Sequence, residues 1–541
     1  MFKLRTNSGL PAHPDVPQVA DLYLKGEIDR RAFLRTVTLL GITAASARAF
    51  TGLIAPTPAQ AQETPKKGGS LRYGGAIMEI NDPMMITWTQ PSNVLRNVCE
   101  YLTRVDEDNI TVPLLARSWD PSEDLMTWKF KLQPGVKWSN GDAFTTEDVA
   151  FNIRRWIAPE SKSSNKSAFS SVKDIEVVND LEFTLHLNRA VLAIPEMLYA
   201  YTCPILHRKF AEQGGVWTKN PIGTGPYTLT EFAVGQKATL RRREGYWGPA
   251  PNLDEIRFID LGTDVSASIQ ALASNQVDLV PAINTTDIDV VKRLPNVSLL
   301  TGRAAQTICI RMQGTQKPFD DIRVRKAMVL ASDNQKMLEL GYRGLGVVGE
   351  NHHVAPFQPE YFKLPPLKRD VAQAKALLAE AGYKDGLDVS LIVGNTQGRW
   401  EQDTAVIMQQ QVAEAGIRMK LDVKPASEFW PIWDKVPFGL TFWAHRPLAV
   451  MTLDLAYRSG GSWNESRYAS KEFDEALNRA GGIVDPRQRA VAMEAVERIL
   501  QDAAVMVQPY WADRFGAMST KLRGFRLHPA TYNNLTTAWL A

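Results

Sequence analysis

Between residues 127 and 148 the sequence reads Thr127-Trp128-Lys129-Phe130-Lys131-Leu132, then Pro134-Gly135, then Thr145-Thr146-Glu147-Asp148. Polar and apolar residues alternate over 127–132, and this pattern predicts a half-buried strand. The Pro-Gly pair predicts a turn. A threonine at the cap position with acidic residues in the first turn predicts a helix that continues over 149–156. A strand, a turn and a helix are therefore expected in close succession.

Helices and strands continue to alternate toward the C-terminus. Helical spacing over 266–275 is followed directly by an apolar strand over 277–280. Further helices are predicted over 323–341, 369–381, 399–415, 472–479 and 486–504. Further strands are predicted over 71–73, 181–187, 227–232, 388–393, 418–423 and 506–510. No internal repeat is evident, so the order predicts a mixed α/β fold rather than a solenoid or propeller.

Composition excludes several classes of protein. Of 541 residues, 44% are hydrophobic and 22% are charged, which fits a folded globular chain rather than a disordered one. No apolar run of about 20 residues occurs, and the mean hydropathy of −0.22 excludes a polytopic membrane protein. The net charge of +3 comes from the first 61 residues, so the remainder is neutral and gives no electrostatic case for nucleic acid.

The N-terminus has the features of an export signal. Arg30-Arg31 precedes Phe33-Leu34, a weakly apolar stretch covers 36–47, and the small-residue pattern Ala59-Gln60-Ala61 follows. The apolar stretch is too short to span a hydrocarbon core of about 30 Å. Residues 1–61 are therefore predicted to be a twin-arginine signal peptide, cleaved before Gln62. The alternative is an amphipathic helix that happens to begin with two arginines.

Cysteine usage is sparse and uninformative about redox chemistry. The three cysteines, Cys99, Cys203 and Cys309, lie about a hundred residues apart, and no Cys-x-x-Cys spacing occurs. This spacing argues against a structural zinc site or an iron–sulfur cluster. Buried free thiols are expected, with one disulfide at most. Because no cysteine follows the apolar stretch until Cys99, a lipid anchor is not expected and the mature chain should be free in the periplasm. We expect no metal and no cofactor.

Eight segments, in order along the chain, resemble one known family. They cover 115–119, 127–130, 134–141, 146–149, 223–227, 246–247, 318–327 and 374–383. Together they resemble the peptide/nickel-type (family 5) solute-binding proteins of bacterial ABC importers. Most of these segments consist of residues typical of turns and helix caps, so each alone is weak evidence for the family. The resemblance, however, covers nearly the whole mature chain.

The resemblance implies a two-lobed α/β binding protein of cluster C, type II. Lobe I would be discontinuous, formed by 62–104, 216–304 and 505–541, with an inserted subdomain over 105–215. Lobe II would cover 305–504. Two strands crossing between the lobes would act as a hinge, and the ligand would be enclosed in the cleft. The implied protein is a monomer and not an enzyme; its partners are a small-molecule ligand, inner-membrane permease subunits and, during export, the twin-arginine translocase.

The resemblance also points to a ligand site with one departure from the family. Members that bind peptides have a tryptophan followed three residues later by an aspartate, which pairs with the peptide's α-ammonium. Here the corresponding stretch is Phe442-Trp443-Ala444-His445-Arg446-Pro447, so an arginine stands in the aspartate position. A guanidinium repels an ammonium and binds a carboxylate with two parallel hydrogen bonds. The expected ligand therefore bears a carboxylate, such as an opine, a sugar acid or a modified amino acid.

Other residues near this stretch are further candidates. Trp443, His445 and Arg446 are joined by Trp463 and Asn464 from the glycine-rich loop 459–465, and by Arg311 after the strand 307–310. Aromatic walls with a few polar groups suit small-ligand sites. The alternatives are that Arg446 pairs internally with Asp454 or Glu465, that Arg311 is a plain surface arginine, and that the tryptophans serve core packing.

Rival functions find less support in the sequence. Residues 344–349 spell Gly-x-Gly-x-x-Gly, but a predicted helix precedes this segment and a polar stretch follows it, the reverse of a dinucleotide site. His352-His353 alone lacks the ligand count that zinc requires. No nucleophile motif is visible, so no catalytic residues are assigned. The remaining alternatives are an oligopeptide or dipeptide receptor, and a periplasmic redox or hydrolytic enzyme or chaperone on the same export route.

Overall fold

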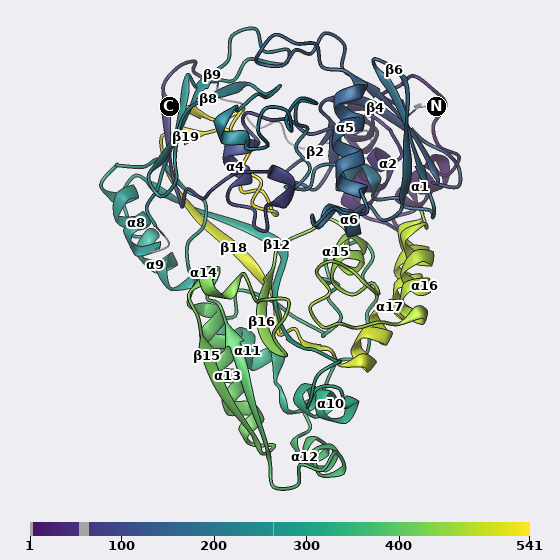
Figure 1. The fold of residues 1–541 in the computed structure, drawn as a ribbon, viewed down its shortest axis with the longest axis vertical. Helices are drawn as coiled ribbons and strands as arrows, with labels where there is room; N and C mark the ends of the chain where they lie inside the picture. Colours follow the sequence, from purple (N-terminus) through teal and green to yellow (C-terminus); the bar gives the residue numbers. More distant parts are fainter. Residues whose placement is uncertain (1–3, 53–63, 263–264) are drawn as a thin grey trace. The chain divides into compact units, whose positions relative to one another are not determined.

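A computed structural model describes residues 4–52, 64–262 and 265–541. The chain divides into two compact units. Unit 1 comprises Met1–Gly302, Val484–Pro486 and Phe515–Ala541, and unit 2 comprises Arg303–Ile483 and Arg487–Arg514. Two strands, β12 (Val297–Met312) and β18 (Tyr510–Ser519), contain a boundary between the units (Figure 1). In the described part of the chain, no helix has the length and apolar character needed to cross a membrane.

The main sheet of unit 1 is mixed. Its strands run in the order β18-β11-β1-β10-β9-β8. The bounds are β1 Ser70–Gly74, β8 Tyr227–Ala233, β9 Lys237–Arg242, β10 Glu255–Ile259 and β11 Leu279–Val280. β1 lies parallel to both β10 and β11, and the remaining pairs are antiparallel. Tyr73 stands opposite Phe258 with 4.7 Å between ring centroids, so aromatic packing supports the parallel register.

A second, four-stranded antiparallel sheet of unit 1 has the order β4-β5-β7-β6. Its strands are β4 Ala116–Pro121, β5 Thr127–Leu132, β6 Val172–Asn179 and β7 Glu182–Leu187. Trp128, Phe130 and Leu132 of β5 are fully buried, which confirms the predicted alternation. The helix α5 (Thr146–Ile157) begins at the predicted threonine cap, and the structure adds a capping box in which Asp148 accepts a 3.0 Å hydrogen bond from the amide of Thr145.

Shorter elements connect the two sheets of unit 1. The helices are α4 Ser92–Leu95, α6 Asn165–Ala168, α7 Ile194–Met197, α8 Val265–Ala273 and α9 Ile288–Val291. Two small hairpin-like pairs are formed by β2 Thr103–Val105 with β3 Thr111–Pro113, and by β19 Leu522–Arg523 with β20 Trp539–Leu540. Single 3-10 turns cover Pro83–Met85, Trp217–Lys219 and Thr285–Asp287.

Three N-terminal helices, α1 (Val16–Leu24), α2 (Arg30–Leu39) and α3 (Ala44–Gly52), pack within unit 1. α2 begins with the two arginines, is capped by Asp29 and buries Phe33. The indole nitrogen of Trp119 in β4 donates a 2.9 Å hydrogen bond to the carbonyl of Leu39. The predicted cleavage residues 59–61 lie outside the described residues. The helix α2 thus packs against the body of unit 1.

Unit 2 combines a sheet with flanking helices. Its strands follow the order β15-β14-β16-β12-β18, with β13 paired to β18 and β17 paired to β12. Their bounds are β13 Gly346–Val348, β14 Leu387–Val393, β15 Ile417–Val423, β16 Phe438–Trp443 and β17 Met506–Val507. The helices are α10 Ile322–Ala331, α11 Asn334–Gly341, α12 Val371–Glu380, α13 Trp400–Ala413, α14 Ala426–Phe429, α15 Ala449–Ala456, α16 Lys471–Gly481 and α17 Pro486–Ala503. Figure 1 shows α13 lying along β15.

Two predicted elements of unit 2 are wrong in detail. The single helix expected over 323–341 is two helices, because Ser332 and Asp333 are extended and the Asp333 carboxylate caps α11 by accepting from the amide of Lys336. The strand expected over 506–510 is interrupted, since Pro509 has no N–H to donate to a ladder. The other predicted helices and strands are present with shifted ends.

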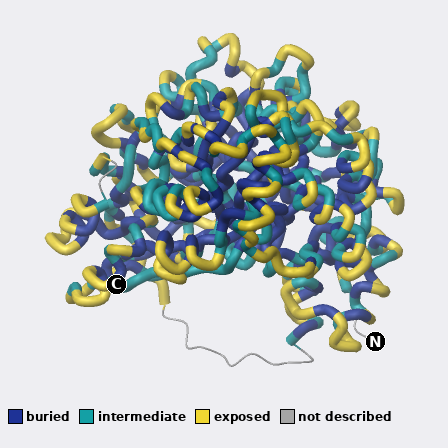
Figure 2. Tube along the Cα trace, turned by 90° about the horizontal axis from the view of Figure 1, so that it is seen from below, coloured by how far each residue is buried: buried dark blue, intermediate teal, exposed yellow. Residues whose placement is uncertain are grey.

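Buried residues fill the interior of each unit, and exposed residues gather on the outer loops (Figure 2). The three cysteines are free and buried, as expected. The glycine segment 344–349 forms β13 and its flanks rather than a phosphate loop, because α11 precedes it and the described residues 349–370 contain no helix. The sequence-based rejection of a dinucleotide site is therefore confirmed by the local structure.

Candidate functional site

The candidate site lies in unit 2, where β16 ends. Trp443 is the last residue of β16 and stands opposite Thr307 of the antiparallel strand β12. The segment 444–448 follows and leads into α15. A strand end followed by a short loop fixes the position of Trp443 while leaving the next side chains free of the ladder. The site is thus built on a rigid strand and one connecting loop.

Three tryptophans form a cluster around Trp443. Ring centroids lie 5.9 Å apart for Trp443 and Trp463, 5.7 Å apart for Trp433 and Trp463, and 6.5 Å apart for Trp433 and Trp443. All three contacts are edge-on, the geometry that the charge distribution of aromatic rings favours. We call Trp433, Trp443 and Trp463 the tryptophan cluster. Trp443 is buried, whereas Trp463 retains exposed surface.

Arg446 lies against this cluster. Its guanidinium carbon is 5.6 Å from the ring centroid of Trp443 and 6.0 Å from that of Trp463, within cation–π range. The backbone carbonyl of Arg446 accepts a 2.9 Å hydrogen bond from Nε2 of Gln358. The side chain is partly exposed. The structure therefore brings Trp443, Trp463 and Arg446 together, with the positive charge above the aromatic rings.

His445 holds the loop that carries Arg446. Its side chain is buried, and Nδ1 accepts a 2.8 Å hydrogen bond from the amide of Ala305 in β12. Because Nδ1 is the acceptor, the ring cannot carry a proton on that nitrogen while the bond is present. His445 thus serves as an anchor between the loop and β12.

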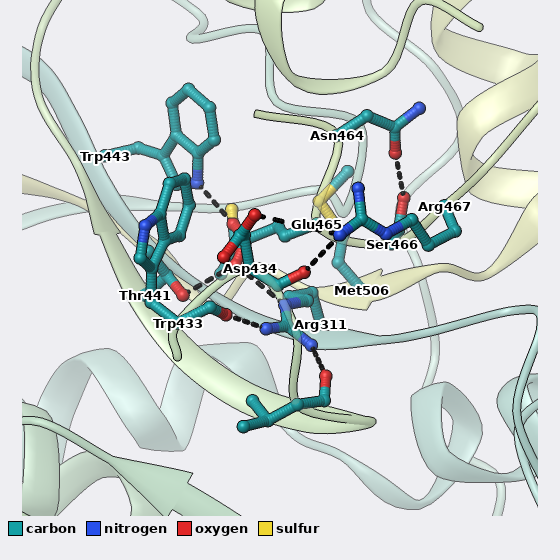
Figure 3. Close-up of polar contacts among 12 residues, drawn as sticks. Arg311, Trp433, Asp434, Thr441, Trp443, Asn464, Glu465, Ser466, Arg467 and Met506 are labelled. Atoms are coloured by element: carbon teal, nitrogen blue, oxygen red, sulfur yellow. Dashed lines mark hydrogen bonds and ion pairs between the residues drawn. The ribbon is translucent and has the colours of Figure 1, made fainter. Parts of the chain in front are cut away.

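The carboxylate of Glu465 organises the base of the cluster (Figure 3). Oε1 accepts a 2.8 Å bond from the indole nitrogen of Trp443, and Oε2 accepts 2.7 Å bonds from Nε of Arg311 and Oγ1 of Thr441. The other two guanidinium nitrogens of Arg311 donate to the carbonyls of Trp433 and Val436. A single buried ion pair therefore ties β12, β16 and the glycine-rich loop together.

These contacts settle one of the sequence alternatives. The suggestion that Arg311 is a plain surface arginine is wrong, because only 2% of its side chain is exposed. The alternative that Arg446 pairs with Glu465 or Asp454 stays a prediction. Glu465 accepts from Arg311, Thr441 and Trp443, and Asp454 accepts a 2.6 Å bond from Nε of Arg458. All three guanidinium nitrogens of Arg311 donate hydrogen bonds within the protein, so we do not propose that Arg311 binds the ligand.

Asn464 braces the glycine-rich loop. Its amide nitrogen donates to the carbonyls of Tyr468 at 2.6 Å and Arg458 at 3.1 Å, and its oxygen accepts from Oγ of Ser466 at 3.0 Å and the amide of Tyr468 at 3.2 Å. These bonds use the donors and acceptors of the amide. Asn464 is 3% exposed, and its amide group already bonds within the protein, so we do not propose it as a ligand contact.

A buried polar group lies behind the tryptophan cluster. Nδ1 of His353 is 2.8 Å from the hydroxyl of Tyr457, and its ring centroid is 5.4 Å from that of Trp443. Burial, together with the positive charge of Arg446, lowers the pKa of His353 to about 3. His353 is therefore neutral at physiological pH. In the described part of the chain, no group of His, Cys, Asp or Glu side chains has an arrangement that would hold a metal ion.

Sequence reasoning missed two parts of the site. Trp433 was not singled out, although Trp430 and Trp433 have the i, i+3 spacing that places side chains on one side of a turn. Glu465 was considered only as a partner of Arg446, because the 154 residues that separate it from Arg311 hide their pairing.

The fold and this site define an extracellular solute-binding protein. The model of the family 5 bacterial extracellular solute-binding proteins (middle region) matches residues 111–464, and the chain belongs to this family. This assignment agrees with the resemblance drawn from the sequence motifs.

Relatives share the whole architecture. The glutathione-binding protein GsiB of Pectobacterium atrosepticum is 25% identical over 479 residues, covering 84% of this chain and 91% of the relative. The solved structure of the Helicobacter pylori periplasmic binding protein DppA with the peptide STSA is similar at a TM-score of 0.79 and 22% identity, covering 88% of this chain and 98% of that one. AgaA from A. tumefaciens R10, solved with agropinic acid, is similar at a TM-score of 0.80 and 22% identity, covering 87% and 99%. The predicted fold class, a two-lobed α/β periplasmic binding protein, is confirmed.

Proposed function

We propose that this chain is the periplasmic substrate-binding component of an ABC importer. It captures one small polar solute in the interlobe cleft that the family resemblance implies, and it delivers that solute to inner-membrane permease subunits as a monomer without chemical change. Membership of family 5 and the transport role of the named relatives support this function.

The ligand is a carboxylate-bearing molecule that lies against Trp443 and Trp463 with its acid group toward Arg446. The observation that carries this proposal is the guanidinium above both rings, at 5.6 Å and 6.0 Å. The aromatic rings offer apolar contact area to the body of the ligand. The guanidinium favours a negatively charged group, because it can donate paired, charge-assisted hydrogen bonds. The similarity to AgaA, which was solved with agropinic acid, favours an acidic ligand.

A panel of ligands and one pair of variants test the proposal. Titration calorimetry should show binding of an opine, a sugar acid or an N-acetylated amino acid, and little binding of dipeptides with free amino groups. Arg446→Gln should weaken acid binding by about tenfold or more, since a charge-assisted hydrogen bond contributes about 1.5–3 kcal/mol. Arg467→Gln is the matched control, because this arginine belongs to unit 2 and lies 3.7 Å from Asp434. Tight peptide binding that is unchanged in Arg446→Ala would overturn the assignment.

A peptide receptor is the second candidate, favoured by the relatives solved or named with peptides. Mass spectrometry of the compound that co-purifies with the protein separates the two, because a peptide and a small acid differ in composition. An extracted peptide would favour this second function over the carboxylate ligand, and the transport role would stand in both cases.

Residues 1–61 direct export by the twin-arginine route, with cleavage before Gln62. The arginine pair at the start of α2 supports this assignment. Replacing Arg30 and Arg31 with lysine should leave the precursor in the cytoplasm, whereas Arg48→Lys in the same segment should not. The mass of the periplasmic protein measures cleavage, and a mature form that retains residue 30 would contradict it.

A further inference from the structure

Unit 1 contains a cavity of about 1080 Å³ that the proposed function does not use. Its walls come from parts of the chain that are far apart in sequence, namely the α4–β2 connection, the β9–β10 loop and the β19–β20 pair. All of the lining residues belong to unit 1. Ligand pockets for small molecules typically have volumes of about 300–1,000 Å³, so this cavity can accommodate a whole organic molecule.

Positive charge dominates the lining of the cavity. Its cationic residues are Lys67, Arg96, Arg104 and Arg523, and Glu100 is the single acidic residue in the lining. Glu100 is buried and accepts hydrogen bonds from the hydroxyl of Tyr246 at 2.7 Å and the indole nitrogen of Trp247 at 2.8 Å. Burial raises the pKa of Glu100 to about 7, so at neutral pH only about half of its negative charge offsets the cations.

Two of these arginines have unused hydrogen-bond donors. Arg96 is stacked among three tyrosines, 3.6 Å from the ring centroid of Tyr532, and its Nη2 donates to the carbonyl of Tyr199 at 3.3 Å. Its Nε and Nη1 are buried and have no acceptor among the described residues. For Arg104, in β2, the described residues likewise provide no ion pair or hydrogen bond to the side chain. Buried donors without acceptors are costly, and an anion would satisfy them.

The aromatic wall of the cavity is fixed in place. Tyr246 and Trp247 lie 5.6 Å apart between ring centroids, and both are held by the carboxylate of Glu100. Trp539 and Tyr101 add further apolar surface to the lining. Because these side chains are already ordered, binding of a planar ring does not require the free-energy cost of ordering them.

We infer that this cavity is a second ligand site, which takes an aromatic carboxylate or sulfonate with the anion at Arg104 and Arg96 and the ring against Trp247. The site is independent of Arg446 and of the tryptophan cluster, because its residues belong to the other unit. Binding here therefore does not require the proposed transport function to be correct.

Fluorescence titration of the full chain with anilinonaphthalene sulfonate, an aromatic sulfonate, tests this site. Saturable binding of one equivalent is expected, with competition by benzoate and none by benzamide, its neutral counterpart. Arg104→Gln should weaken the affinity about tenfold or more, whereas Arg104→Lys should retain most of it. Circular dichroism and a thermal melt on each variant establish that it is folded.

Arg446→Gln provides the control for the other site. Unchanged binding of the probe in Arg446→Gln, together with weakened binding in Arg104→Gln, supports the cavity. If Arg446→Gln weakens binding and folded Arg104→Gln does not, the probe occupies the unit 2 site and the inference is overturned. Equal competition by benzamide and benzoate overturns it as well, because recognition would then not depend on the anion.

Discussion

Glu465→Gln is the substitution that most directly challenges the structural account of the site. The change keeps the shape of the side chain but removes its charge, which leaves the guanidinium of Arg311 buried without a counter-ion. Arg311 and Glu465 side chains are only 2% and 5% exposed, so water cannot compensate. The new amide also places an N–H group where Trp443, Thr441 or Arg311 now donates.

The magnitude follows from these contacts. Breaking a buried ion pair by removing one partner costs about 3–5 kcal/mol. A total stability of about 5–15 kcal/mol makes this loss easy to measure. Urea unfolding followed by tryptophan fluorescence should show the loss, because the indole of Trp443 is bonded to Glu465.

Asp434→Asn is the matched control. Asp434 lies 3.7 Å from Arg467, whose side chain is 40% exposed, and an exposed pair contributes under about 1 kcal/mol. The double variant Arg311→Met with Glu465→Gln should be more stable than the sum of the single losses predicts, since it leaves no unpaired charge. A Glu465→Gln loss no larger than that of Asp434→Asn, or strictly additive losses in the double variant, would contradict a stabilising role for the Arg311–Glu465 ion pair.

Three further predictions concern stability and reactivity. Thr145→Ala should cost about 1 kcal/mol in a thermal melt by removing the α5 capping box, and an unchanged melting temperature would argue against that cap. Burial raises the pKa of Glu401 from 4.5 to about 7, so the stability it contributes is present below about pH 4.5 and lost as pH rises through about 7. Relative to Glu401→Gln, the wild type should lose up to ~3 kcal/mol over that window in urea unfolding; a gain would contradict the sign. Burial raises the pKa of the thiols of Cys99, Cys203 and Cys309. A disulfide reagent at about pH 8 should therefore label no cysteine in the native protein and all three after denaturation.

Most helices and strands could be predicted from neighbouring residues in the sequence. Contacts between residues far apart in the sequence could not. The cap at Thr145 and the alternation in β5 depend on neighbouring residues, so the sequence alone sufficed for both. The break between α10 and α11 was missed because the helical pattern of apolar residues continues across Ser332, although Asp333 is a good cap. Periodicity shows which face of a helix is buried, and it does not reveal a two-residue break in the helical backbone.

The candidate site was predicted only in part for the same reason. Trp443, Trp463 and Arg446 were found from a family motif and a glycine-rich loop, and the structure brings them together. Arg311 was misjudged, because its environment is created by a loop more than a hundred residues away. The cavity of unit 1 left no local signal at all, since its walls combine residues from 65 to 539.

The packing of α2 on unit 1 has a consequence for the proposed removal of residues 1–61. Gly41, with φ of +84°, approaches the carbonyl of Trp119 so closely that a Cβ there would lie 2.3 Å from the oxygen, and Leu39 is the acceptor for the Trp119 indole. The proposed cleavage after Ala61 would remove the acceptor of the Trp119 indole and the backbone that covers the Trp119 carbonyl. The surface of unit 1 at β4 would then differ before and after export.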